Sequence, residues 1–386
     1  MAKRTKPKSP EPQNQPEAAR PSRGLDVLPL SAILGQERAL AVLRNSCAAG
    51  RLHHAWIFTG PVGVGKCTTA LAFAAALLDP SQALDPRGNP APDPESDIQS
   101  MIRAGSHPDL HIIRKELAAF SRDADTRKSR QTVIGVEVLR EFFIEPAART
   151  RRVQVDSRAA KVLILDEAHL LNLEGQNALL KTLEEPPSGT IMILVTPNED
   201  RLLPTVRSRC QRVPFTPLTE EAMAAWYAQR GLLHAPPAWL AHYGQGSPGA
   251  VAWALTFELS RWAEPMDAAV EALLHGEHRH NLPDLMTDLA KAWTERLAEG
   301  NDLASKDVAG KTAAFEVLRL AASMFNRRVL AHTDNSPLCE RLSASIERIV
   351  DAERHVASNV NVQFVMESLV ADWASLWRQP TLTPAR

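Results

Sequence analysis

The 386-residue sequence is poor in cysteine and aromatic residues and has no excess of charge of either sign. Its four cysteines, Cys47, Cys67, Cys210 and Cys339, form no C-x-x-C pair, which argues against a zinc ribbon or a disulfide scaffold. The 44 Lys and Arg against 45 Asp and Glu exclude a global positive field, so any DNA contact must be local. Because there is no run of about eighteen apolar residues and no signal-peptide core, we expect a cytoplasmic protein with reduced thiols.

The distribution of apolar residues predicts a tail and three domains. Residues 1–24 are rich in Pro and charge and should form a disordered tail. Short apolar runs alternate with helical patterns over residues 25–215, which predicts an α/β domain with a parallel sheet flanked by helices. The remainder holds seven of the eight tryptophans and no strand pattern. We expect it to form a small helical lid over 216–270 and an all-α domain over 271–386.

Individual elements follow from the same patterns. Strands are expected at 54–58, 110–113, 162–165 and 190–195, and helices within 25–50 and over 68–78. Five prolines within 79–95 predict a surface loop. The segment 114–130 mixes both charge signs with few apolar residues and is expected to be a second, mobile loop.

A phosphate-binding loop is expected between the first strand and the helix that follows it. Gly60-Pro-Val-Gly63-Val-Gly65-Lys66-Cys67 matches G-x-x-x-x-G-K-[ST] except at its last position. The glycines would let backbone N–H groups face phosphate oxygens, and Lys66 would reach the β- and γ-phosphates of ATP. The alternative is a glycine turn with a structural role alone.

Cys67 stands where a hydroxyl normally coordinates magnesium. A neutral thiol is a poor ligand for this hard cation. Thr68 is adjacent, but neighbouring helical residues point about 100° apart, so its hydroxyl does not simply replace the missing one. The sequence therefore predicts that ATP with Mg²⁺, if bound, occupies a weak or vestigial site.

Two acidic residues follow the strand expected at 162–165. Asp166 would hold magnesium and Glu167 would polarise an attacking water, as in a Walker B motif. The alternative is an acidic helix cap. His169, three residues after Asp166, is more typical of packing than of catalysis.

Several further strings, taken together, resemble the AAA+ subunits of the bacterial DNA polymerase III clamp loader. They are Gly35-Gln36, His54-Ala55, the phosphate loop, His107-Pro-Asp109-Leu, Asn177-Ala-Leu-Leu-Lys181-Thr-Leu-Glu-Glu185-Pro-Pro187 and Leu203-Pro-Thr205-Val-Arg-Ser208-Arg209-Cys210. The resemblance covers about 25–249, and within the family it is greatest to the delta-prime branch. It implies that the C-terminal domain is an oligomerisation collar.

The resemblance also implies a role for Arg209, that of an arginine finger on ATP bound to a neighbouring subunit. Such a finger stabilises charge on the transferred phosphoryl group. The alternative is that Arg209 only pins a loop to a carboxylate.

Three departures from the family pattern bear on the nucleotide. The lid string Gly246-Ser-Pro-Gly249 carries glycine where active members have arginine. Proline occupies what corresponds to the other phosphate sensor, which leaves Thr196 and Asn198 as candidates. The Pro-rich stretch replaces the four-cysteine zinc module of many members, so we expect no zinc.

A basic cluster precedes the strand at 162–165, and it could contact DNA phosphates. Its members are Arg149, Arg151, Arg152, Arg158 and Lys161. No aromatic stacking residue accompanies them, and a solvated face is the favoured interpretation.

These observations favour a delta-prime-like subunit whose own ATPase is weak or absent. It would join other AAA+ subunits in a ring and support ATP-driven loading of the sliding clamp onto primed DNA during replication. The main alternative is an active gamma/tau-like ATPase, because Lys66, Asp166 and Glu167 are all present. A small-molecule kinase and a purely structural scaffold remain as further alternatives.

Overall fold

The computed structural model describes residues 25–50, 52–81, 83–128, 132–232, 236–277, 281–299 and 306–378. The strands are β1 (Ala55–Thr59), β2 (Leu110–Ile113), β3 (Lys161–Leu165), β4 (Thr190–Thr196) and β5 (Gln211–Pro214). The helices are α1 (Glu37–Ala48), α2 (Lys66–Leu78), α3 (Asp97–Arg103), α4 (Ala124–Lys128), α5 (Val136–Leu139), α6 (Glu145–Ala148), α7 (Leu173–Glu184), α8 (Pro204–Arg207), α9 (Glu220–Gln229), α10 (Ala238–Gly244), α11 (Pro248–Thr256), α12 (Ser260–Leu274), α13 (Leu282–Glu299), α14 (Lys306–Ala331), α15 (Ser336–Ala357) and α16 (Val362–Arg378). Short helical segments are η1 (Leu30–Ala32), η2 (Lys115–Phe120), η3 (Arg140–Ile144), η4 (Ala168–Leu170) and η5 (Glu199–Arg201).

The five strands form one parallel sheet in the order β2-β3-β4-β1-β5. β1 lies between β4 and β5, and the loop after it is therefore carried by an interior strand. In open parallel sheets ligands bind beyond the carboxyl ends of the strands. The fold thus brings the segments that follow β1, β2, β3 and β4 to one edge.

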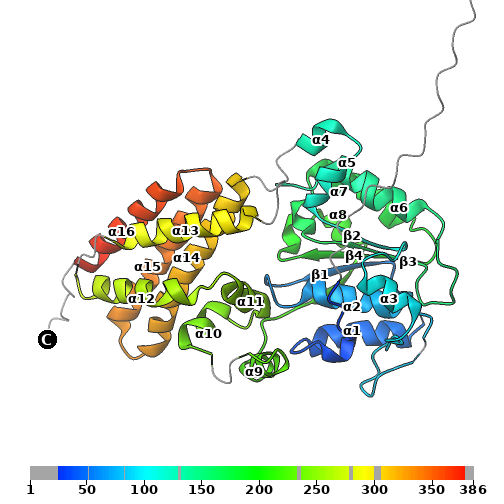
Figure 1. Ribbon diagram of the computed structural model, residues 1–386, viewed down its shortest axis with the longest axis horizontal. Coiled ribbons are helices and arrows are strands. Elements are labelled where there is room, and N and C mark those ends of the chain that lie inside the picture. The colour runs from blue at the N-terminus through cyan, green and yellow to red at the C-terminus, as the bar shows by residue number, and fades with distance from the viewer. Residues whose placement is uncertain are drawn as a thin grey trace, which may run out of the picture.

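Helices cover both faces of the sheet, because successive side chains of each buried strand point to opposite sides. Trp56 and Phe58 of β1 pack in the core with α1, α2 and α3, whereas Ala55 and Ile57 pack in the core with α5, α7 and α8. The result is the expected three-layer α/β domain, on the right in Figure 1.

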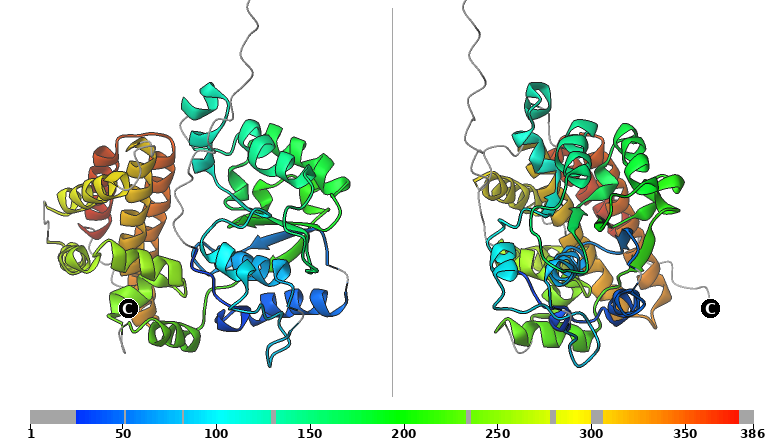
Figure 2. Two further views of the ribbon diagram at one scale, coloured as in Figure 1. Left: turned by 45° about the vertical axis from the view of Figure 1, so that its right-hand side comes forward. Right: turned by 90° about the vertical axis from the view of Figure 1, so that its right-hand side faces the viewer.

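The described chain after β5 is helical and lies beside the sheet domain (Figures 1 and 2). One continuous cluster of buried apolar residues extends from Leu218 to Trp377 and includes Tyr243, Trp293 and Trp373. Helices α9 to α11 of the predicted lid therefore share a core with the helices that follow. No described helix is long and apolar enough to cross a membrane.

The expected strands are confirmed to within one residue at each end, and the proline-rich stretch 79–95 contains a turn closed by an isolated bridge between Leu84 and Pro90. The prediction of a loop over 114–130 is wrong. This segment forms η2 and α4, which are held by tertiary contacts: Glu141 accepts from the Ser121 hydroxyl at 3.0 Å and from the Arg122 amide at 2.9 Å. The predicted tail, 1–24, lies outside the described residues.

Candidate nucleotide site

The loop between β1 and α2 wraps around the side chain of Lys66. Its ammonium donates to the carbonyl oxygen of Gly60 at 2.6 Å and also to that of Pro61. The side chain is buried, and burial lowers the pKa of Lys66 to about 8, although the nearby Asp166 carboxylate acts in the opposite direction. Lys66 is therefore a buried cation at the position where a phosphate loop needs one.

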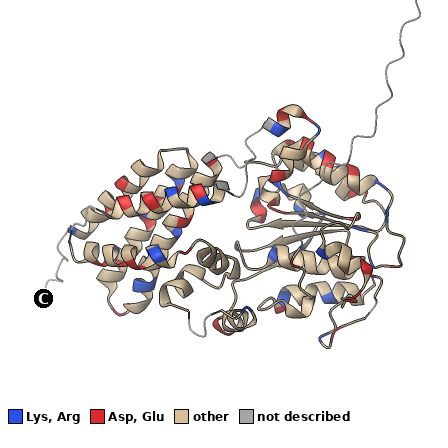
Figure 3. Ribbon diagram, viewed as in Figure 1, with Lys and Arg blue, Asp and Glu red and all other residues tan. Residues whose placement is uncertain are grey.

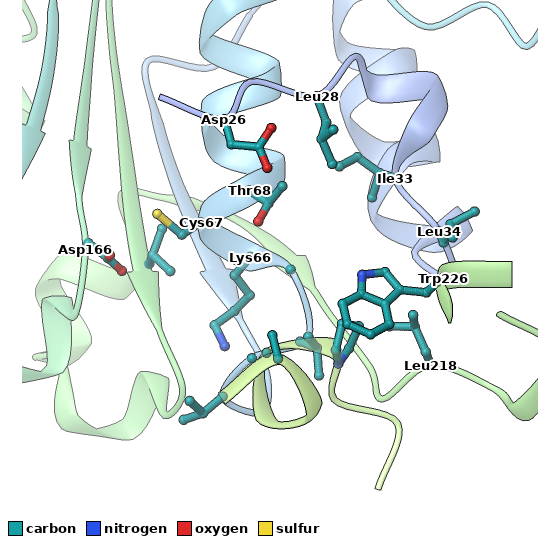
Figure 4. A pocket seen from close by; sticks show the side chains of 18 of the residues that line it. Asp26, Leu28, Ile33, Leu34, Lys66, Cys67, Thr68, Asp166, Leu218 and Trp226 are labelled. Atoms are coloured by element: carbon teal, nitrogen blue, oxygen red, sulfur yellow. The ribbon is translucent and has the colours of Figure 1, made fainter. Parts of the chain in front are cut away.

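A cavity of about 640 Å³ opens beside this loop and is large enough for a nucleotide-sized ligand. One wall is polar and includes Lys66, Cys67, Thr68, Asp166 and Glu167. The opposite wall is largely apolar and consists of Leu28, Ile33, Leu34, Leu218 and Trp226 (Figure 4). A charged phosphate chain and a flat base would suit these two walls respectively.

The side chain of Cys67 faces Asp166, whereas Thr68 lies nearer Asp26 (Figure 4). Burial, helped by Asp166, raises the pKa of the Cys67 thiol to about 11, so the sulfur carries a proton at neutral pH. The predicted geometry of the helix start is thus confirmed: Thr68 does not take over the position of Cys67.

Asp166 and Glu167, the two carboxylates predicted to form a Walker B motif, both have cationic partners. The Arg114 guanidinium contacts Asp166 at 3.1 Å, and the Lys115 ammonium contacts Glu167 at 3.1 Å. Glu167 has a φ of 54°, in the left-handed region that a glutamate rarely adopts. With a neutral thiol at Cys67 and a paired carboxylate at Asp166, the donor set does not fit Mg²⁺.

The lid contacts the phosphate loop directly. At the start of α11, the Gly249 amide donates to the Gly63 carbonyl at 2.8 Å, and the Ser247 hydroxyl donates to the Val62 carbonyl at 3.0 Å. A Cβ on Gly249 would lie 2.7 Å from the Gly63 Cα, so the glycine found in place of the family's arginine permits this close approach.

Gln36 links the phosphate loop to the segment after β5. Its side-chain amide donates to the carbonyl of Val64 at 3.2 Å and to that of Thr216 at 2.7 Å, and its Oε1 accepts from the Thr216 amide at 3.2 Å. The Gly35-Gln36 string therefore has a structural role beside the cavity.

Thr196 and Asn198, the two predicted sensor candidates, are engaged with each other at the end of β4. The Thr196 hydroxyl donates to the Asn198 carbonyl at 2.9 Å and accepts from the Asn198 amide at 3.2 Å, while the Asn198 side chain caps η5. Among the described residues, Pro197 contributes to the cavity wall, and Thr196 and Asn198 do not.

Arg209 follows α8 and lies outside the wall of its own chain's cavity, as far as the described residues define it. Its guanidinium contacts the Glu184 carboxylate at 2.7 Å, and 35% of its side chain is exposed. Gln176 of α7 fixes the preceding segment by accepting from the Leu203 amide at 2.7 Å and donating to the Arg201 carbonyl at 3.2 Å.

Several residues of the basic cluster around the start of β3 form hydrogen bonds with backbone carbonyls of this chain. Lys161 is buried and donates to the carbonyls of Pro146 and Arg149, and Arg158 donates to the Ser81 carbonyl at 2.8 Å. Lysine and arginine are interspersed with acidic residues over both parts of the molecule (Figure 3). The solvated-face interpretation is wrong for Lys161, because it points inward.

Sequence reasoning missed three residues at these sites, Arg114, Lys115 and Glu184. A signal for the first two was present: they follow one predicted strand directly, as Asp166 and Glu167 follow another. Knowing that the two strands are neighbours would have brought the four side chains together. Glu184 ends α7 and has no comparable signal.

The chain is similar in sequence to subunits of bacterial DNA polymerase III. The family model described as "DNA polymerase III, delta subunit" matches residues 35–219. The delta' subunit of Bacillus subtilis is 27% identical over 348 residues, which cover 87% of this chain and 95% of that subunit. The gamma/tau subunit of Mycobacterium bovis is 34% identical over 197 residues, which cover 51% of this chain and 30% of that subunit.

The chain thus spans about 30% of the length of the gamma/tau relatives it matches and nearly all of the delta' relative. A solved structure of a DNA polymerase III gamma subunit-related protein from Thermotoga maritima aligns with 88% of this chain and all of that one, at 14% identity and a TM-score of 0.41, which is too distant to bear on function. The sequence relatives confirm the resemblance: the chain is related to the delta' and gamma/tau subunits of DNA polymerase III.

Proposed function

We propose that this relative of the DNA polymerase III delta' and gamma/tau subunits is a delta'-like clamp-loader subunit. It would assemble with other AAA+ subunits in a ring, through a collar over 271–386, and support ATP-driven loading of the sliding clamp onto primed DNA in the cytoplasm. The match along 95% of the delta' relative supports this choice of branch.

The position of Arg209 is the observation that carries the proposal. A finger that serves a neighbour must lie away from its own cavity and keep its charge accessible. Arg209 meets both conditions, and its ion pair with Glu184 is solvent-accessible, since 35% of the arginine side chain and 50% of the glutamate side chain are exposed. Such pairs contribute only about 0–1 kcal/mol to stability, so a phosphate group can displace the carboxylate at little cost.

The chain's own ATPase is proposed to be weak or absent. Glu167 is held by Lys115, which makes it a poor partner for an attacking water, and Cys67 offers no hydroxyl to magnesium. The identity with gamma/tau subunits and the presence of Lys66 favour an active ATPase as the second candidate. Phosphate release by the isolated chain would support that candidate.

The direct test is reconstitution of the complete loader with Arg209→Ala, followed by single-turnover ATP hydrolysis and clamp loading. Removal of an arginine finger should slow hydrolysis at the facing site by about 10³-fold or more. Arg212→Ala is the matched control, because Arg212 lies three residues away in a similarly exposed pair with Glu199 at 3.3 Å. Undiminished hydrolysis and loading with Arg209→Ala would contradict the finger assignment.

A further inference from the structure

The register of the sheet places two cations opposite two carboxylates beside the phosphate loop. In the parallel pair β2 and β3, Ile113 is the partner of Leu165, and the Asp166 amide donates to the Ile113 carbonyl at 2.9 Å. Arg114 and Lys115 follow β2 directly, and Asp166 and Glu167 follow β3 directly. The alignment of the two strands thus brings the two segments together, and the ion pairs Arg114–Asp166 and Lys115–Glu167 form between them.

Arg114 lies between the two groups that would otherwise flank a magnesium ion. Its Nε donates to Asp166 Oδ2 at 3.1 Å, and its Nη2 donates to Cys67 Sγ at 3.6 Å. Cys67 stands at the hydroxyl position of the phosphate-loop motif, and Asp166 at the metal-binding position of Walker B. One guanidinium therefore spans both positions.

The charge at this edge equals that of a metal-loaded site. Arg114 and Lys115 together bring two positive charges, as one Mg²⁺ would, and face the same two carboxylates, Asp166 and Glu167. Lys66 supplies the third cation, as in any phosphate loop. The electrostatic requirement for a bound triphosphate is thus met by side chains alone.

Arg114 also retains the capacity to bind phosphate. A guanidinium has five N–H donors, and the contacts with Asp166 and Cys67 use two of them. Half of the side chain, 51%, is exposed, and the two groups that it contacts, Cys67 and Asp166, line the cavity. Arg114 therefore lies directly behind the cavity wall with donors left over for an anion. Guanidinium binds phosphate oxygens in a planar, bidentate geometry.

We propose that Arg114 and Lys115 replace magnesium in this chain, so that the cavity binds the triphosphate of a nucleotide without a divalent cation. This inference rests on the nucleotide binding expected of a clamp-loader subunit but is independent of Arg209. It identifies Arg114 as a residue that determines ligand specificity. The bound nucleotide would stay intact, because no metal activates it and Glu167 is neutralised by Lys115.

The test is calorimetric binding of ATP to the full-length protein, once in excess EDTA and once in excess magnesium. The expected dissociation constants agree within about threefold. Arg114→Gln should weaken binding in EDTA by about tenfold or more, the usual effect of losing a charge-assisted hydrogen bond. Arg122→Gln is the matched control, because Arg122 belongs to the same segment and is 69% exposed in its pair with Glu141.

A second variant separates loss of the cation from loss of folding. Cys67→Thr combined with Arg114→Gln restores the hydroxyl and vacates the metal position, so it should bind ATP in magnesium at least about tenfold more tightly than in EDTA. Thermal unfolding of each variant verifies the fold.

Two results would overturn the proposal: tenfold tighter binding of ATP to the unaltered protein when magnesium is added, or no binding under either condition. Either result leaves the finger hypothesis standing if Arg209→Ala still abolishes hydrolysis in the reconstituted loader. Conversely, if ATP binds independently of magnesium but Arg209→Ala has no effect on hydrolysis by the reconstituted loader, only the arginine-finger hypothesis is contradicted.

Discussion

The Arg209 guanidinium and the Glu184 carboxylate, 2.7 Å apart, join the segment after α8 to the last residue of α7. The same guanidinium donates from its Nη1 to the Thr205 carbonyl at 2.9 Å, so it is held by two partners at the surface. The pairing is what the loop-pinning alternative requires. It is also compatible with an arginine finger that exchanges the Glu184 carboxylate for a phosphate group of the neighbouring subunit. The two interpretations predict different effects of removing Glu184.

Glu184→Ala should leave the function of the assembled loader intact while lowering the unfolding free energy by less than about 1 kcal/mol, because the pair is exposed. The measurements are chemical denaturation of the isolated chain and ATP hydrolysis by the reconstituted loader, with the adjacent Glu185→Ala as control. A loss of hydrolysis as large as that of Arg209→Ala would show that Glu184 positions the arginine.

The two tyrosines of the chain provide a matched pair for the helical core. The buried Tyr243 hydroxyl donates to the Glu316 carboxylate, while the Tyr227 hydroxyl is buried without a partner among the described residues. Tyr243→Phe should lower the unfolding free energy by about 1.5–3 kcal/mol, because the lost bond is to a charged group. Tyr227→Phe should be neutral or slightly stabilising, as denaturant titration of both variants would measure. Equal effects of the two substitutions would contradict this assignment.

Gly249→Ala should weaken the contact between lid and phosphate loop. The added Cβ would lie 2.7 Å from the Gly63 Cα and 3.0 Å from its carbonyl oxygen, so α11 must shift. We expect a loss of about 1–3 kcal/mol in thermal or chemical unfolding, as for other overpacked sites. Gly310→Ala in α14 is the control: its Cβ has no neighbour closer than 3.8 Å, and a stabilisation of about 0.4–1 kcal/mol is expected. A Gly249→Ala protein as stable as the unaltered one would exclude a tight contact.

Lys66 should give stability a specific pH dependence. Its pKa is about 8 in the folded chain and 10.5 when the side chain is fully solvated. Between these two pH values the unfolded state binds more protons than the folded state. The free energy of unfolding therefore increases with pH over this range. The Lys66→Met variant has no titrating group at this position and lacks this pH dependence. The stability of the unaltered protein relative to Lys66→Met should therefore rise by about 2 kcal/mol between pH of about 7.5 and about 9.5. A constant difference in denaturant titrations would show that the lysine is not desolvated.

The parallel sheet and the edge formed by its carboxyl ends were predictable because β1, β3 and β4 are buried on both faces and contain apolar runs at 55–58, 162–165 and 191–195. β5 was missed because Val213 is its one buried residue and Pro214 ends it, a composition that only an edge strand tolerates. The helices over 115–128 were missed because their stability comes from contacts such as Ser121 with Glu141, and not from local periodicity.

The residues of the candidate site could be predicted from the sequence, but their ion-pair partners could not. Lys66, Asp166 and Glu167 meet at one cavity as expected, because each follows a strand of the sheet. Their counter-ions depend on strand order and register, which no local pattern encodes. For the same reason the sequence indicated Arg209 but not Glu184, since the pair requires α7 and α8 to be neighbours in space.

The continuous core from Leu218 to Trp377 has a mechanical consequence. Because the lid and the C-terminal helices share one core, we expect them to move as a single rigid unit. This unit is joined to the sheet domain by the short connection after β5, where Gln36 forms hydrogen bonds with Thr216. It contacts the loop after β1 where the Gly249 amide donates to the Gly63 carbonyl. A displacement of the segment around Gly63 would thus be transmitted through this one packed unit as far as α15 and α16.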